Sequence, residues 1–383
     1  MTDWEPPLSL FSSIEPAIAG GTFDAERLTQ ARYAAGLSKA KLAEQIGVTP
    51  AAIGQYESRQ MSPRPDVLAS LSDVLDVPVD FFTLTVGRPL TRVDGMKAHF
   101  RSLRSTTTRD RQKALAFIEQ VWELANALER RVRLPGLALP LDLDTTSPAA
   151  AAQDLRARWG FGAKPIKHLV AQLETRGLIV SILSLASADV ARVGAFSTSH
   201  LPRPVVIVTP ERAMSVYVHR FTVAHELGHL ILHRDAAPGD PQQEREADQF
   251  AAELLTPRAQ ITNMLPRTVN LPKLAALSQH WGVSVDSLLI RMKETGTVSE
   301  VSVRRGYQRL NQLRAAGGDP AEPVSNFPGE MPSMLRHAAT LADESGYSIT
   351  HLARELRWKP ARVREVLGEV DERPHLRILP PVD

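Results

Sequence analysis

The residues best suited to chemistry lie in the segment His225-Glu226-Leu227-Gly228-His229. The two histidines are four residues apart, so on a helix both imidazoles project from one face and can bind a single zinc ion. Glu226 lies about 100° around the same helix, beside the metal. From there its carboxylate can take a proton from a zinc-bound water and pass it to a leaving amine. The segment therefore predicts metal-assisted peptide hydrolysis.

A zinc ion at this position needs a third protein ligand. The chain has no cysteine, so the ligand must be a histidine or a carboxylate. Downstream, Glu244 and Asp248 lie one turn apart on one face of a predicted helix. Glu246 is the alternative ligand, although it points in another direction on that helix. A loop of turn-forming residues at 235–241 can fold this helix back against the first.

The pair formed by Glu244 and Asp248 resembles the Glu-x-x-x-Asp element of gluzincin peptidases. The resemblance implies that Glu244 is the third zinc ligand and that Asp248 orients a ligand histidine. Residues 220–230 together with 244–257 resemble the ImmA/IrrE family of metallopeptidases, over roughly residues 150–290 of the chain. This resemblance implies a site-specific protease that cleaves an XRE-type repressor and so relieves transcriptional repression, often after stress or DNA damage.

Two other parts of a peptidase site are less well specified by the sequence. Tyr217, His219 and His200 are candidates to stabilise an oxyanion, and their spacing does not choose among them. The predicted strand at 205–208 is a candidate to pair with an extended substrate.

A helix-turn-helix pattern begins near Ser38, which can cap the first helix of the motif. Gly47 supplies the left-handed residue of the turn. Thr49 and Pro50 then give the second helix an N-cap and a first-position proline. The segment 27–82 resembles the XRE family of phage-repressor-like DNA-binding domains over nearly its whole length.

In this geometry the second helix of the motif enters the major groove, where Gln55 can read adenine. The predicted DNA contacts are Thr49, Ala51, Ala52 and Gln55 in the groove, with Lys39 and Arg59 at phosphates. Residues 24–80 carry six basic and eight acidic side chains, so DNA affinity needs dimerisation or the basic segment 88–113. That segment has eight basic residues against two acidic ones. The net charge of the whole chain, +2, indicates nothing about nucleic acid.

These sites require several folding units, as the length of 383 residues also predicts. The expected fold is mainly α with a small β-sheet: an all-α helix-turn-helix domain, an α+β zincin-like (gluzincin) peptidase domain and C-terminal helices. Runs of apolar or β-branched residues predict strands at 178–183, 193–196 and 205–208. The expected division is a tail at 1–23, the DNA-binding domain at 24–85, a basic linker and amphipathic helix at 86–135, the peptidase domain at 136–295 and a helical domain at 296–383.

Segments 277–288 and 352–366 echo the helix-turn-helix pattern and are interpreted as packing units. No signal peptide or transmembrane run is evident, which predicts a cytoplasmic protein without a membrane partner. The sequence thus predicts a DNA-binding zinc metallopeptidase that binds an operator as a homodimer and cleaves a regulatory protein, an XRE-type repressor, in response to stress. Self-cleavage within the linker at 83–110 stays open.

Two alternatives stay open at this point. One is a non-proteolytic XRE-type repressor or antitoxin-like regulator whose zinc-site domain acts as a sensor. The other is a protease whose XRE domain only docks a substrate or a nucleic-acid trigger. An inert sensor has no need of Glu226, so its presence favours an active peptidase.

Overall fold

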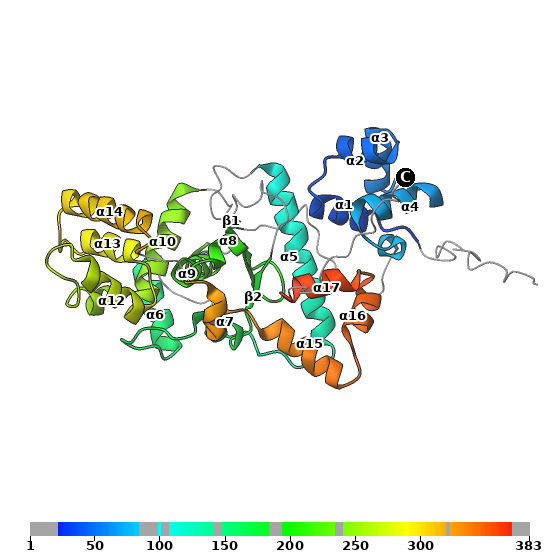
Figure 1. Cartoon of the computed structure of the whole chain (residues 1–383). Helices are drawn as coiled ribbons and strands as arrows, with labels where there is room; N and C mark the ends of the chain where they lie inside the picture. Colours follow the sequence, from blue (N-terminus) through cyan, green and yellow to red (C-terminus); the bar gives the residue numbers. More distant parts are fainter. Residues whose placement is uncertain are drawn as a thin grey trace, which may run out of the picture.

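The computed structural model describes residues 22–83, 99–100, 107–140, 147–183, 194–233, 240–318 and 322–369. Helices dominate these ranges and surround one small sheet, in agreement with the predicted fold class (Figure 1). No helix in the described ranges has the length and apolar character that crossing a membrane requires. Most of the basic segment 88–113 lies outside the described residues.

The N-terminal helical unit has the turn that the sequence predicts. Ser38 caps the second helix, Gly47 ends it with a φ of 72°, and Thr49 caps the third helix by accepting a hydrogen bond from the amide of Ala52. Leu28, Leu42, Ile53 and Leu71 are buried between these helices. The elements of this unit are α1 (Ala25–Ala34), α2 (Lys39–Ile46), α3 (Pro50–Glu57), α4 (Pro65–Leu75) and η1 (Val79–Phe82).

Helix α5 (Thr108–Glu129) connects this unit to the rest of the molecule. Its side toward α1 carries a buried polar contact, in which the guanidinium of Arg27 lies 2.7 Å from the carboxylate of Glu123. The amide of Gln30 donates to Glu123 and to Glu119, both at 2.9 Å. Three C-terminal helices also pack on α5 (Figure 1): α15 (Met334–Glu344), α16 (Ile349–Leu356) and α17 (Pro360–Val366).

The C-terminal residues differ from the predicted separate domain at 296–383, because they divide between two cores. Helix α14 (Glu300–Ala315) places Val303 and Leu310 in the core of the predicted peptidase region. Helices α15–α17 instead share the core of α5 and the N-terminal unit. Arg357, at the left-handed turn between α16 and α17, donates to the backbone carbonyls of Asp80 and Thr83. This helix pair therefore has a packing role, as the sequence indicates.

The sheet has the strand order β1-β3-β4-β2, with β2 parallel to β4 and the other pairs antiparallel. The expectation that residues 205–208 pair with a substrate is wrong, because β4 is central and both its edges are hydrogen-bonded to other strands. The edge of β3 that faces away from β4 is paired with β1, a two-residue strand that the sequence did not predict. The strands are β1 (His99–Phe100), β2 (Ile179–Ile182), β3 (Ala195–Thr198) and β4 (Val205–Val208).

Helix α9 (Val216–Leu232) contacts β3 and β4 and lies beside α10 (Pro241–Leu255). Helix α6 packs against α10. The turn between α12 and α13, at Gly282, approaches α9 through Arg220. The remaining elements of this region are α6 (Pro148–Arg158), α7 (Leu169–Glu174), α8 (Pro210–Ala213), α11 (Arg258–Ile261), α12 (Leu271–Trp281), α13 (Val285–Glu294), η3 (Val324–Asn326) and η4 (Pro328–Glu330).

Candidate metal centre

Close packing of α9 against α10 brings the predicted zinc ligands together. Gly228 makes this approach feasible, because a Cβ atom at this position would lie only 3.1 Å from the Phe250 ring and 3.2 Å from the Cα of Ala247. Contacts this short are uncommon for a Cβ atom in a packed interior. The helix that carries His225 and His229 therefore lies directly against the helix that carries Glu244.

His225, His229 and Glu244 form a group whose ligand atoms all lie within 4.8 Å of one another. The Nε2 atoms of the two histidines are 3.1 Å apart, and carboxylate oxygens of Glu244 lie 3.5 Å from His225 and 3.4 Å from His229. A tetrahedral zinc ion with ligands at about 2.0–2.1 Å separates its ligand atoms by roughly 3.3 Å. Two imidazoles and one carboxylate at this spacing therefore fit a zinc ion.

Each ligand histidine is oriented by a contact at its other ring nitrogen. Nδ1 of His225 lies 2.8 Å from a carboxylate oxygen of Asp248, so Nε2 is the ring nitrogen that faces the proposed metal position. Nδ1 of His229 lies 3.1 Å from Nδ1 of His233, whose Nε2 is 2.8 Å from a carboxylate oxygen of Glu246. Glu246, the alternative ligand, thus contacts His233 and is not part of the ligand group.

The ionisation of these groups suits a cation. Burial lowers the pKa of His229 to about 4, so its imidazole is neutral near pH 7. Burial acts to raise the pKa of Glu244, but its contacts with the imidazoles of His225 and His229 outweigh the burial and lower the pKa to about 2. Neutral imidazoles and an ionised carboxylate are the forms that bind metal ions.

Glu226 is fully buried beside the ligand group. Its carboxylate accepts a hydrogen bond of 2.7 Å from the hydroxyl of Ser197, which belongs to strand β3. The sheet thereby fixes the direction of the predicted proton-transfer group. Sequence reasoning missed Ser197, which lies 29 residues away and in no motif with Glu226. It also missed His233, although its spacing of four residues from His229 is a signal of contact on a helix.

The three candidates for oxyanion stabilisation lie in different surroundings. The ring of His219 is buried and lies 3.1 Å from the carbonyl oxygen of Glu330, and burial lowers its pKa to about 4. His200 follows β3, where its amide donates to the hydroxyl of Thr198. Tyr217 lines a cavity of about 470 Å³ together with Asp248, the partner of His225. The three predicted ligands and Glu226 are not among the residues that line this cavity, so it does not single out Tyr217 as the oxyanion donor.

The predicted DNA-contacting residues lie on the outer side of the N-terminal unit, where α3 is exposed (Figure 1). Gln55, Ala51 and Thr49 are exposed, whereas Ala52 is half-buried. The hydroxyl of Thr49 is already used as the helix cap. Helix α3 therefore leaves Gln55 as its exposed long polar side chain in the predicted groove-facing set.

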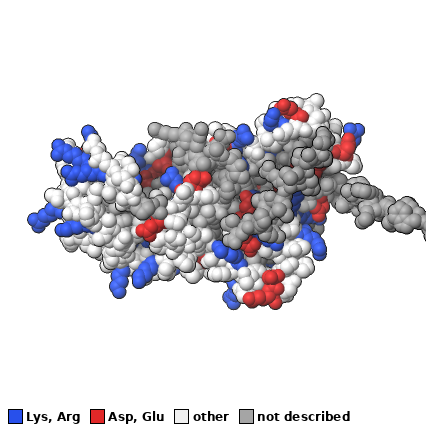
Figure 2. Space-filling view, viewed as in Figure 1, with Lys and Arg blue, Asp and Glu red and all other residues white. Residues whose placement is uncertain are grey.

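The two predicted phosphate contacts form ion pairs within the unit. Lys39 lies 3.1 Å from Glu57 and its side chain is 48% exposed, and Arg59 lies 2.9 Å from Glu26 and is 60% exposed. Figure 2 shows that side chains of both signs lie on this unit, whereas Lys and Arg gather at the end of the molecule formed by α12–α14. The exposed arginines of α14 are Arg304, Arg305, Arg309 and Arg314.

The fold, the exposed helix α3 and the candidate metal centre define a regulator with a DNA-binding unit and a metallopeptidase-like unit in one chain. Two family models agree with this division: the IrrE N-terminal-like domain matches residues 173–293, and the helix-turn-helix family matches residues 28–82. The chain thus fuses an XRE-type helix-turn-helix domain to an ImmA/IrrE-like peptidase domain. No curated protein matches the chain significantly.

Proposed function

We propose that the protein is a zinc-dependent peptidase that regulates transcription. The observation that carries the proposal is the group of His225, His229 and Glu244 with the buried carboxylate of Glu226 beside it. A zinc ion held by this group supplies Lewis-acid polarisation of a substrate carbonyl and of water. Glu226 accepts a proton from the attacking water and returns it to the leaving amine.

The surrounding residues keep these groups in place. Asp248 holds the imidazole of His225 with Nε2 directed at the ligand group, and Ser197 holds the carboxylate of Glu226 through its hydroxyl.

Metal analysis of the wild type beside Glu244→Ala and Glu246→Ala tests the ligand assignment. At saturating zinc, we expect one zinc ion per chain in the wild type and in Glu246→Ala, and none in Glu244→Ala. Glu246 is the matched control because it is on the same helix but contacts His233. Absence of zinc from the wild type, or its loss only from Glu246→Ala, would contradict the assignment.

The proposed regulatory role is DNA binding by a homodimer through α3, combined with stress-triggered cleavage of an XRE-type repressor. Support comes from the exposure of Gln55 on α3 and from the presence of both domains in one chain. The test is incubation of the zinc-loaded protein with XRE-type repressors encoded beside its gene, with and without damaged DNA. Cleavage that disappears in Glu226→Gln supports the proposal, whereas zinc binding without cleavage supports a sensor-repressor.

A further inference from the structure

A cavity of about 1220 Å³ lies apart from the metal ligands, none of which lines it among the described residues. Its walls come from the connection between α6 and α7, the first turns of α9, α11 and the residues after it, the end of α12 and the segment that contains η4. Its volume exceeds the range of roughly 300–1,000 Å³ that is usual for small-molecule sites. The cavity therefore has room for an organic ligand of considerable size.

The charge of the cavity favours an anion. Lys164 and Lys167 line it, and neither forms an ion pair with any carboxylate in the described ranges. The only carboxylate among the described lining residues is Glu330, which forms a buried ion pair with Arg220. Glu330 also accepts hydrogen bonds from the amides of Leu169 and Val170 at 3.0 and 3.3 Å. Its charge is thus compensated, and the two lysines leave an excess of positive charge.

The uncharged part of the lining favours a flat ring with polar edges. Aromatic residues make up 5% of the chain, yet five of them line this cavity: Trp159, Phe161, Tyr217, Trp281 and Phe327. Five side-chain amides, each able to donate and to accept hydrogen bonds, lie among them: Gln172, Gln260, Asn263, Gln279 and Asn326. Rings stack on a flat heterocycle, and amides pair with its nitrogen and oxygen atoms.

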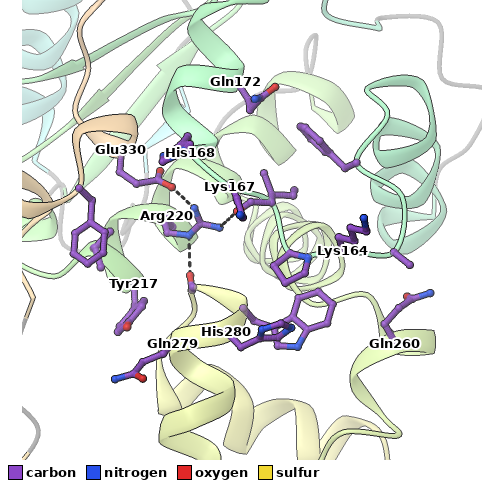
Figure 3. A pocket seen from close by; sticks show the side chains of 18 of the residues that line it. Lys164, Lys167, His168, Gln172, Tyr217, Arg220, Gln260, Gln279, His280 and Glu330 are labelled. Carbon is purple, nitrogen blue, oxygen red and sulfur yellow. Dashed lines mark hydrogen bonds and ion pairs between the residues drawn. The ribbon is translucent and has the colours of Figure 1, made fainter.

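Arg220 links this cavity to the helix of the metal centre. Its guanidinium donates to the carbonyls of Gly282 at 2.8 Å and Ile166 at 2.7 Å, besides its ion pair with Glu330. Figure 3 shows Arg220 in the middle of the lining, with Lys164 and Gln260 on one side and Tyr217 on the other. A ligand in the cavity would therefore contact the segments of Ile166, Gly282 and Glu330. Arg220 of α9 holds these three segments together.

We infer that this cavity binds a nucleotide, with its phosphate at Lys164 and Lys167 and its base among the rings and amides. An anion, a flat heterocycle and hydrogen-bonding edges are the three features that the lining selects, and a nucleotide combines them. The inference concerns binding alone and does not depend on peptide hydrolysis, so it can fail while the proposed peptidase function stands.

Isothermal titration of the full-length, zinc-loaded protein with the four nucleoside 5′-monophosphates, one at a time, tests the inference. We expect at least one of them to bind with one molecule per chain. The matching nucleoside and inorganic phosphate, each alone, should bind at least tenfold more weakly. Absence of saturable binding by all four, or equal affinity for inorganic phosphate alone, would overturn the inference.

Variants place the ligand in this cavity. Lys164→Ala/Lys167→Ala should weaken nucleotide binding at least tenfold, and both lysines are exposed, so the fold is preserved. Lys273→Ala is the matched control, because Lys273 is an exposed lysine of α12 that does not line the cavity. His280→Ala, at an exposed ring of the lining, should weaken binding of the nucleotide but not of phosphate. Wild-type affinity in the double variant would assign the nucleotide to another site and overturn the inference.

Discussion

At the scale of single residues, the metal centre depends on contacts one step beyond the ligands. His233 lies between His229 and Glu246 and contacts both. The pair of His233 and Glu246 therefore sets the ring orientation of His229, although neither residue of the pair binds metal in the proposed site. Outer partners of this kind raise the basicity of a ligand and fix its orientation, and their loss costs metal affinity. In the proposed zinc site, His233 is therefore a positioning residue.

Replacement of His233 by alanine should weaken zinc affinity by about 10- to 100-fold, the usual effect of losing an outer partner. The stoichiometry at saturating zinc should remain one per chain, because the three ligands are intact. Competition with a chromophoric chelator measures the affinity. His280→Ala, at an exposed histidine outside the metal centre, is the control. An unchanged affinity in His233→Ala would show that His229 needs no such support.

At the scale of elements, the contact between α1 and α5 is polar although it is buried. The side chains of Arg27 and Glu123 are 2% and 1% exposed, and Gln30 donates a hydrogen bond to the same carboxylate. Removing one partner of such a pair leaves an uncompensated charge in the interior, which costs about 3–5 kcal/mol. The attachment of the DNA-binding domain is thus specific, since a shifted α1 would separate this pair.

Glu123→Ala should therefore lower the free energy of unfolding by about 3 kcal/mol or more. The double variant Arg27→Met/Glu123→Leu should recover much of this loss, because it removes both charges together. Urea unfolding followed by circular dichroism gives the comparison. If Glu123→Ala were as stable as the wild type, the buried pair would not hold α1 against α5.

The elements also show which parts of the fold are predictable from sequence. Ser38, Gly47 and Thr49 are local signals, and the turn they predict is the one observed. The spacing of four residues places Glu244 and Asp248 on one face of their helix, and the resemblance to the gluzincin element implies that this face meets the histidine helix. The contact of Ser197 with Glu226 joins residues far apart in sequence through packing of the sheet on α9, which leaves no pattern along the chain.

At the scale of the whole molecule, the DNA-binding domain is held on the side opposite its predicted DNA-reading helix. Helix α5 packs on α1, and Arg357 of the C-terminal helix pair donates to carbonyls at the end of the domain. Helix α3 remains exposed beyond these contacts (Figure 1). DNA can therefore reach α3 without separation of the domain from the peptidase region.

Gln55→Ala should weaken binding to a selected operator by about 1–3 kcal/mol, the usual contribution of a bidentate base contact. Zinc content should not change, since α3 is remote from α9 in the fold. Fluorescence anisotropy with an operator selected from random DNA measures the effect. Gln312→Ala, at an exposed glutamine of α14, serves as the control. Equal binding by Gln55→Ala and Gln312→Ala would remove Gln55 from the DNA interface.

The position of β1 has a consequence for the peptidase-like domain. His99 and Phe100 belong to the segment between the DNA-binding domain and α5, and they pair with the strand that carries Ser197. A polypeptide that added itself to this edge of β3 would have to displace the chain's own strand. Such competition would be reciprocal: a polypeptide at this edge would release residues 99–100, and whatever holds these residues in place would raise the concentration of polypeptide that binding needs. One short strand would then couple two events: the binding of a polypeptide at this edge of the sheet, and the release of the segment that joins the DNA-binding domain to α5.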